Sequence, residues 1–366
     1  MHSTIKFRAI LILALSTITI SSAMAQNEPA PLFPLSTVVS DSRADAVYPS
    51  VSGGFLVYSQ RKHGNYSVVQ TSVNTPDNNE ERRIVPEQLN EAVRFGVAIR
   101  DGSIGYVSNR MGPVSAWMRQ AQGDGHVAIG NMGVFKGAIV PMNLHASVDG
   151  QVWCFDSTLE KVLQSRAITQ FGNAAKHMEL LGQTWRFYSS DAFEHKLGYR
   201  ATKTGNGSKF RQPSLFIFNR DTNQLTMIPN AMDGAISPDG KRIAFVRDTN
   251  GNYDIWMQNL NGKNLTQLTS TPFGEFEPAW SPDGKHIAFT SNRDSKGDVL
   301  AMSIYTLNLS KGATTRLTQA TRAIDGSPAW KDTHTILFHS NRSPSKPQTR
   351  TVSNWNIWQV NIQGEF

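Results

Sequence analysis

Acidic residues stand at or just before a series of similar apolar segments along this 366-residue chain. Carboxylates that converge on one opening focus negative potential, and their oxygens suit a hard cation such as Ca²⁺ or the basic side chains of a peptide. The alternative is that they are turn residues and solvated loop acids. The candidates for such a ring are Asp45, Glu91, Asp233, Glu275, Glu277 and Asp325.

Two sets of basic residues accompany these acids. An arginine ends each Ser-x-Arg segment, and its recurrence indicates a role inside each repeat, such as pairing with a loop carboxylate; these are Arg61, Arg110, Arg293 and Arg342. The second set lies in a stretch, 192–212, that interrupts the repeats, so it is a candidate for specificity unless it is only a polar excursion. This basic insert contains Lys196, Arg200, Lys203, Lys209 and Arg211.

A sequence repeat must position these residues. The segment Ala235–Phe245 reads Ala-Ile-Ser-Pro-Asp-Gly-Lys-Arg-Ile-Ala-Phe, and it returns as Ala279–Phe289 and, more loosely, as Ala329–Phe338. Successive copies begin 44 and then 50 residues apart. A β-rich repeat of this length is typical of a propeller, in which each unit is one four-stranded blade.

The repeat also predicts individual strands. In the clearest unit, strands are expected at 276–281, 286–290, within 298–309 and at 314–318, with turn residues between them. The preceding unit covers 233–269, and weaker copies begin near Tyr48, Val97 and His145. A degenerate unit is assigned to Thr184–Ser189, Leu215–Phe218 and Gln224–Ile228. We predict an all-β, six-bladed β-propeller, with seven blades as the alternative.

The two ends of the chain predict how the ring closes. The last unit has candidate strands at 327–330, 335–339 and 356–362 but no fourth strand, whereas Leu32–Ser36 resembles the fourth-strand segment Thr315–Gln319. We therefore expect residues 32–39 to complete the last blade, so that the N-terminal strand pairs with the C-terminal blade and removes an exposed edge. The propeller would then span 32–366.

The repeat resembles the TolB-type propeller repeat. The likeness lies in Ser-Pro-Asp-Gly-Lys-x-Ile-Ala-Phe at Ser281–Phe289, followed by a Ser-x-Arg segment, an Asp-Ile-Trp strand at Asp254–Trp256 and a Leu-Thr ending. It is strongest over 231–343 and weaker over 45–110. The resemblance implies a TolB-like six-bladed propeller, but without room for the small α/β domain that precedes the propeller in TolB. Contacts made by that domain, including those to TolA, therefore cannot be carried over.

Function is expected to be binding rather than catalysis. The sequence has no Gly-x-Ser-x-Gly nucleophile elbow and no His-Glu-x-x-His metal motif. The resemblance implies a binding or scaffolding protein that docks a protein or peptide of the cell envelope on its channel face. The alternative is a secreted propeller enzyme, of lyase or lactonase type, that uses a channel-bound metal. A Ca²⁺ ion in the central channel is compatible with the binding protein as well.

The N-terminus predicts export. Lys6 and Arg8 precede an apolar core from Ala9 to Ile20, and Ala23-Met24-Ala25 offers a cleavage site, so residues 1–25 read as a signal peptide and 26–31 as a tether. An uncleaved anchor is the alternative. The mature chain is expected in the periplasm and not to span the membrane. The net charge of +7 is spread thinly, without the dense basic clusters that favour nucleic acid.

Overall fold

The computed structural model describes residues 33–62, 65–76, 83–85, 93–110, 115–123, 125–129, 142–157, 214–249, 252–298, 300–319, 323–344 and 354–362. Pro31–Phe366 forms one compact unit. The regular elements in the described ranges are all β-strands. A search of these ranges finds no helix with the length and apolar character that a membrane span needs.

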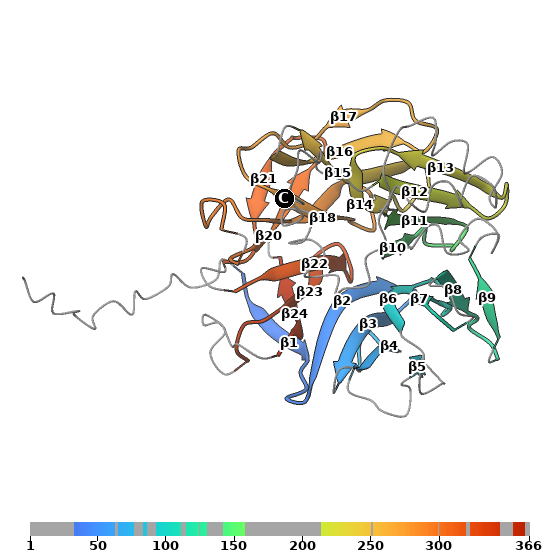
Figure 1. Cartoon of the computed structure of the whole chain (residues 1–366). Helices are drawn as coiled ribbons and strands as arrows, with labels where there is room; N and C mark the ends of the chain where they lie inside the picture. The colour runs from blue at the N-terminus through green and yellow to red at the C-terminus, as the bar shows by residue number, and fades with distance from the viewer. Residues whose placement is uncertain are drawn as a thin grey trace, which may run out of the picture. The chain divides into compact units, whose positions relative to one another are not determined.

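The strands form six antiparallel sheets of four strands, arranged as the blades of a propeller (Figure 1). Blade 1 contains β2 (Ala44–Ser52), β3 (Phe55–Lys62), β4 (Asn65–Ser72) and β5 (Arg83–Val85). Blade 2 contains β6 (Val93–Ala98), β7 (Ile104–Ser108), β8 (Ser115–Arg119) and β9 (His126–Ala128). Blade 3 contains β10 (Met142–Ala146), β11 (Val152–Ser157), β12 (Ser214–Asn219) and β13 (Gln224–Ile228).

The second half of the chain continues the same order. Blade 4 contains β14 (Ala231–Ile236), β15 (Arg242–Thr249), β16 (Asn252–Asn259) and β17 (Thr266–Gln267). Blade 5 contains β18 (Glu275–Trp280), β19 (His286–Ser291), β20 (Ser303–Asn308) and β21 (Thr314–Arg316). Blade 6 contains β22 (Asp325–Trp330), β23 (Thr335–Ser340), β24 (Asn356–Asn361) and, as its fourth strand, β1 (Leu35–Val39).

The prediction of six blades is confirmed, but one assignment within it is wrong. The sequence assigned Leu215–Phe218 and Gln224–Ile228 to a degenerate unit of their own, but they lie in β12 and β13. β12 pairs with β11, and β13 pairs with β12. They therefore complete the blade that begins near His145. A long insertion between the second and third strands leaves the hydrogen-bond ladder of a blade intact, so a gap in the repeat need not mark a new blade. Thr184–Ser189 lies outside the described residues.

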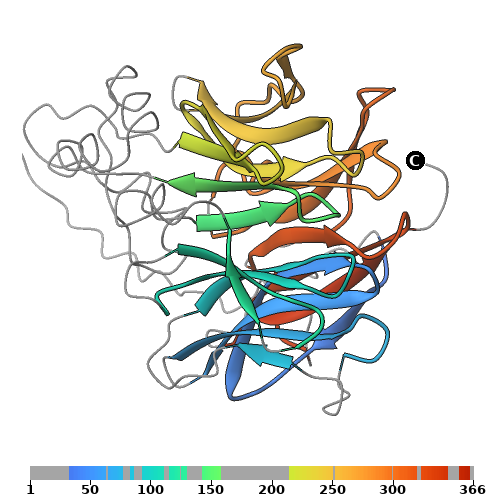
Figure 2. The same ribbon diagram turned by 90° about the vertical axis from the view of Figure 1, so that its right-hand side faces the viewer.

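The predicted closure of the ring is also confirmed. β1 runs antiparallel to β24, and Leu35 lies opposite Val360 while Ser36 lies opposite Gln359. Phe33 and Leu35 pack on a core cluster of blade 6 that includes Trp358. Figure 2 shows the red strands of blade 6 beside the blue strands of blade 1, and β22 contacts β2 directly. The first and last parts of the propeller thus meet in one blade.

The Ser-Pro-Asp-Gly turns set where the first two strands of a blade join. Asp239 accepts a hydrogen bond from the Ser237 hydroxyl at 2.5 Å and one from the Lys241 N–H at 3.1 Å, while Gly240 adopts a φ of 66°. The Ser281 turn repeats these contacts. Side chains of this type stabilise tight turns, and glycine supplies the left-handed backbone without a steric cost. These turns follow the C-terminal ends of the innermost strands, whereas Asp233 and Glu277 lie in the N-terminal halves of β14 and β18.

Buried aromatic residues hold successive blades together. The second strands of all six blades each carry an aromatic side chain that is almost fully buried, at Tyr58, Tyr106, Phe155, Phe245, Phe289 and Phe338. The Trp280 indole N–H donates to the Ala235 carbonyl of the preceding blade at 3.0 Å, and Trp330 does the same to Ala279. Burial of such rings is the main stabilising term between sheets, and the indole bonds fix their orientation.

Candidate functional site

Each innermost strand carries one irregular residue at an equivalent point. There the pairing with the second strand shifts register, and the residue adopts a left-handed backbone with φ between 47° and 56° although it is not glycine. A bulge of this kind re-aims a side chain, and a left-handed non-glycine residue costs about 1–2 kcal/mol. We call these six residues the bulge ring: Tyr48, Phe95, Asn143, Asp233, Glu277 and Ser327.

The bulge ring lines a central cavity of about 430 Å³. All six innermost strands contribute to its wall, and Asp233 and Glu277 are the acidic residues among its lining. Arg100 and Lys331 also line it, and both belong to the connections between first and second strands. The channel therefore has an acidic end at the bulge ring and a basic end near the Ser-Pro-Asp-Gly turns.

Carboxylates of the bulge ring join neighbouring blades. The Glu277 N–H donates to Asp233 Oδ2 at 3.1 Å, and the Ser327 N–H donates to Glu277 Oε2 at 2.8 Å. One blade earlier, the Asp233 N–H donates to Asp156 Oδ1 at 2.9 Å. The Asn143 amide bridges Asp156 and Asp233 at 2.8 and 3.0 Å. Three left-handed residues, Asp233, Glu277 and Ser327, thus direct their N–H groups to an acid of the preceding blade.

The opposite side of the bulge ring is aromatic. The Tyr48 and Phe95 rings lie 5.8 Å apart, and the Tyr48 N–H donates to Nδ1 of the buried His339 at 3.2 Å. The His339 ring also meets Trp355 edge-on at 5.0 Å. One half of the channel mouth therefore presents carboxylate and amide groups from blades 3 to 6, and the other half presents ring faces and edges from blades 1 and 2.

Three of the predicted mouth acids lie elsewhere, in ion pairs within single blades. Asp45 lies 2.7 Å from Arg61, Glu275 lies 2.9 Å from Arg293, and Asp325 pairs with Arg342. None of these three acids lines the central cavity. Glu91 lies outside the described residues. Of the six predicted acids, the structure brings only Asp233 and Glu277 together at the channel.

The arginines of three Ser-x-Arg segments pair with a carboxylate of their own blade, which confirms the role inside the repeat for Arg61, Arg293 and Arg342. Arg110 instead donates to the Tyr106 hydroxyl at 2.6 Å and stacks on Trp117, and Val93 lies opposite Ser108 where blade 5 has an acid. The basic insert, with Lys196, Arg200, Lys203, Lys209 and Arg211, lies outside the described residues.

Several residues of the channel mouth escaped the sequence analysis. Asn143, Ser327, Tyr48 and Phe95 occupy the bulge ring without carrying a charge, and Asp156 and His339 reach it from second strands. A signal existed, because five of the six bulge residues directly precede proline or glycine: Tyr48-Pro49, Phe95-Gly96, Asp233-Gly234, Glu277-Pro278 and Ser327-Pro328.

The carboxylates of the bulge ring act as hydrogen-bond acceptors. Their oxygens accept N–H and O–H donors, as Glu277 does from the Ser327 and Thr290 hydroxyls, and the bond from Ser327 joins blade 6 to blade 5. In the part of the chain that the structure describes, no three His, Cys, Asp or Glu side chains lie together as a metal site would require.

Comparisons with known proteins agree with the fold. Residues 208–304 match the model of the TolB beta propeller domain. A 51-residue stretch is 39% identical to the Tol-Pal system protein TolB of Anaeromyxobacter dehalogenans (strain 2CP-C). This stretch is 14% of this chain and only 12% of that relative.

Solved structures are similar over most of the chain. A putative TolB from Agrobacterium tumefaciens aligns with a TM-score of 0.53 at 13% identity, over 90% of this chain and 97% of that one. An oligogalacturonate lyase in complex with manganese aligns at 0.52 and 11% identity, over 91% and 94%. An acylaminoacyl peptidase from Pyrococcus horikoshii aligns at 0.51 and 9% identity, over 88% of this chain and 46% of that one. At these identities the likeness shows the fold alone.

Proposed function

We propose that this TolB-like six-bladed propeller is an exported binding or scaffolding protein of the periplasm, and that it docks an extended, basic segment of a protein partner at the channel mouth. The N-terminal sequence, with its basic start, apolar core and Ala-Met-Ala site, supports export. The similarity to the TolB relative supports a protein of similar type. Because the match covers only 12% of that relative, its partners are not assigned to this chain.

One observation carries the proposal: the channel mouth has a carboxylate side and an aromatic side. Asp233 and Glu277 line the cavity on one side, and the Tyr48 and Phe95 rings line it on the other. A lysine or arginine side chain suits such a site, since it can bond to carboxylates while its charge or its methylene groups contact an aromatic face. A cavity of about 430 Å³ has room for one such side chain with its flanking backbone.

The test places a photo-crosslinking amino acid in the channel. With the crosslinker at Val51, which lines the cavity, irradiation in an envelope extract should give one defined adduct, identified by mass spectrometry. The same crosslinker at the exposed Lys263 should not give that adduct. An arginine- or lysine-rich peptide should compete, whereas an acidic peptide of equal length should not.

Charge-neutral variants sharpen the test. Glu277→Gln and Asp233→Asn should each weaken capture about tenfold, because a hydrogen bond to a charged group contributes about 1.5–3 kcal/mol. Asp221→Asn removes the same charge from an exposed turn and should leave capture unchanged. Capture that is equal in all three variants, or that acidic peptides block instead, would contradict docking at the carboxylate side.

The alternative, a lyase- or lactonase-type enzyme with a metal in the channel, predicts a different result. Elemental analysis of the purified protein would then find a stoichiometric transition metal, and substitution of His339 or His145 near the channel would release it. Calcium alone would not distinguish the two functions.

A further inference from the structure

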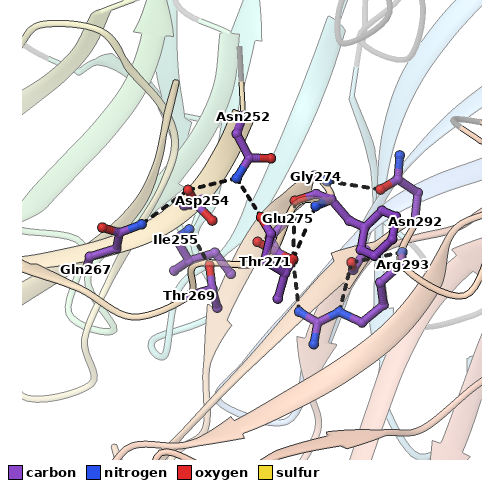
Figure 3. A network of polar contacts seen from close by, with 12 residues as sticks. Asn252, Asp254, Ile255, Gln267, Thr269, Thr271, Gly274, Glu275, Asn292 and Arg293 are labelled. Atoms are coloured by element: carbon purple, nitrogen blue, oxygen red, sulfur yellow. Dashed lines mark hydrogen bonds and ion pairs between the residues drawn. The ribbon is translucent and has the colours of Figure 1, made fainter. Parts of the chain in front are cut away.

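Two buried carboxyl groups face each other where blade 4 meets blade 5 (Figure 3). Asp254 lies on β16 and is 2% exposed, and Glu275 begins β18 and is fully buried. Each carboxyl lies close enough to the other to affect its pKa. This pair is separate from the bulge ring, since neither side chain lines the central cavity.

Each carboxyl has one satisfied oxygen and one that lacks a donor. Asp254 Oδ2 accepts the Asn252 amide at 3.0 Å and the Gln267 amide at 3.2 Å. Glu275 Oε1 accepts Arg293 at 2.9 Å and the Thr271 hydroxyl at 2.5 Å. Asp254 Oδ1 and Glu275 Oε2 are buried and form no hydrogen bond with a described residue, although the Thr269 hydroxyl lies near enough to Glu275 to influence its pKa. Two ionised carboxylates cannot satisfy each other, because both are acceptors only.

The other blades show that Asp254 is a departure from the repeat. The strand pairing places Asp254 opposite Arg247, and the residues at the same register in the other blades are small and uncharged: Ser67, Ser115, Ser214, Ser303 and Asn356. At the boundary between blades 5 and 6, Asp325 takes the place of Glu275 and pairs with Arg342. That boundary therefore pairs one carboxylate with one guanidinium, whereas at the boundary of blades 4 and 5 Glu275 pairs with Arg293 and Asp254 is a second carboxylate.

No other described cation supplies the missing positive charge. Arg293 is bonded to Glu275 and stacks over Tyr305 at 4.7 Å. Arg247 lies over the Phe245 and Trp256 rings at 5.4 Å each, and its Nε has no partner. Arg316 pairs with Asp294 at 2.8 Å. The ion pairs of the described residues therefore leave Asp254 without a cationic partner.

The titration of the two groups agrees with this geometry. Burial raises the pKa of Asp254, and the hydrogen bond to Glu275 partly offsets that rise. Burial also raises the pKa of Glu275, the Thr271 hydroxyl and Arg293 lower it, and the charge of Asp254 raises it again. Two close carboxyls in a desolvated site retain one proton between them well above the pH at which a solvated acid loses it.

We propose that Asp254 and Glu275 share one proton, carried on Asp254 Oδ1 or Glu275 Oε2 and donated to the other, and that this proton makes the boundary of blades 4 and 5 responsive to pH. In acid the proton links the blades. When the pH rises above the pKa of the pair, both groups are ionised, they repel, and the boundary loosens. Because Glu275 lies two residues before Glu277 on β18, the change reaches the bulge ring directly.

The sign of the effect follows from linkage. The folded pair binds a proton more tightly than the unfolded chain does, so its contribution to stability is greatest at low pH and is lost as the pH rises through the raised folded pKa. Asp254→Ser, which copies Ser303 of the next blade, should remove this loss and flatten the dependence of Tm on pH above about pH 4, the ordinary carboxyl pKa.

The experiment combines thermal unfolding with infrared spectroscopy on the full mature chain. As the pH rises past the point at which solvated carboxyls ionise, wild type should still show the carbonyl band of one protonated carboxylic acid. Both Asp254→Ser and Glu275→Gln should lose that band at lower pH than wild type, while Asp221→Asn at an exposed turn should behave as wild type. The proposal is overturned if wild type lacks the band and keeps the same pH slope as Asp254→Ser. It is also overturned if stoichiometric Ca²⁺ raises the Tm of wild type but not of Asp254→Ser, because a cation would then hold the pair.

Discussion

At the scale of single residues, one sequence motif produces ion pairs in very different surroundings. The side chains of Arg61 and Asp45 are 42% and 10% exposed, whereas those of Arg342 and Asp325 are 2% and 0% exposed. Asp325 also accepts the Thr318 hydroxyl at 2.6 Å. Solvent screens the first pair, while the second has lost its hydration and depends on its partner. The two pairs should therefore differ in energy although their motifs match.

Asp325→Asn should lower the free energy of unfolding by about 3–5 kcal/mol, because it leaves the Arg342 charge buried without a counter-ion. Asp45→Asn should cost about 1 kcal/mol or less, since Arg61 can turn to water. Urea denaturation of both variants measures the difference. Equal effects would mean that burial does not separate the two pairs.

At the scale of elements, the innermost strands and the closing strand matter most. The innermost strands leave little space, and a Cβ atom on Gly234 would lie 2.6 Å from Leu215, while one on Gly96 would lie 2.6 Å from Val57. A bulge residue followed by glycine, as at Asp233-Gly234 and Phe95-Gly96, therefore combines the left-handed backbone with the close approach of the preceding blade.

The closing strand β1 can be tested with a disulfide. Ser36 lies opposite Gln359 on β24, and the Gln359 amide donates to the Ser36 hydroxyl at 2.9 Å. Ser36→Cys with Gln359→Cys should form a bond that stabilises the propeller by about 2–4 kcal/mol, because it links residues far apart in the chain. The single native cysteine, Cys154, is buried and should not interfere.

Oxidised and reduced samples of this double variant form a matched pair in guanidinium unfolding. The oxidised form should resist unfolding more, and a reductant should abolish the gain. Failure of the two cysteines to join under oxidising conditions would contradict the β1–β24 pairing.

At the scale of the whole molecule, stability should depend on pH through two opposing groups. The Asp254–Glu275 pair makes the folded state more stable in acid. His145 makes the folded state less stable in acid, because burial lowers its pKa to about 4 and its Nδ1 accepts the Ile236 N–H of the next blade at 3.3 Å. A folded state that keeps histidine neutral binds fewer protons than the unfolded chain, so its stability falls as the pH drops below 6.5 towards 4.

His145→Asn should remove this acid-side loss. The Tm of wild type should fall between pH 6.5 and 4 more steeply than that of the variant, whatever the offset between them at neutral pH. His334→Asn, at an exposed turn, serves as the control and should follow wild type. Parallel curves for His145→Asn and wild type would show that His145 does not control the acid limb.

Much of the fold could be predicted from the sequence because strands and turns leave local signals. The Ser-Pro-Asp-Gly turns marked the first hairpin of a blade, and Leu32–Ser36 predicted the closing strand by its likeness to a fourth strand. Less of the candidate site could be predicted. Of its predicted acids, Asp233 and Glu277 reach the channel, while Asp45, Glu275 and Asp325 pair with arginines.

The repeat, the all-β class and the closure of the ring could be predicted from the chain, since periodicity and turn residues act over short distances. Which acids face the channel depends instead on how the strands bulge and pack. A bulge shifts the register by one residue, so Glu275 and Glu277, two positions apart, enter different environments. The packing of the blades also determines that Asp254 meets Glu275, because residues on neighbouring blades approach each other only when the sheets pack about a common axis.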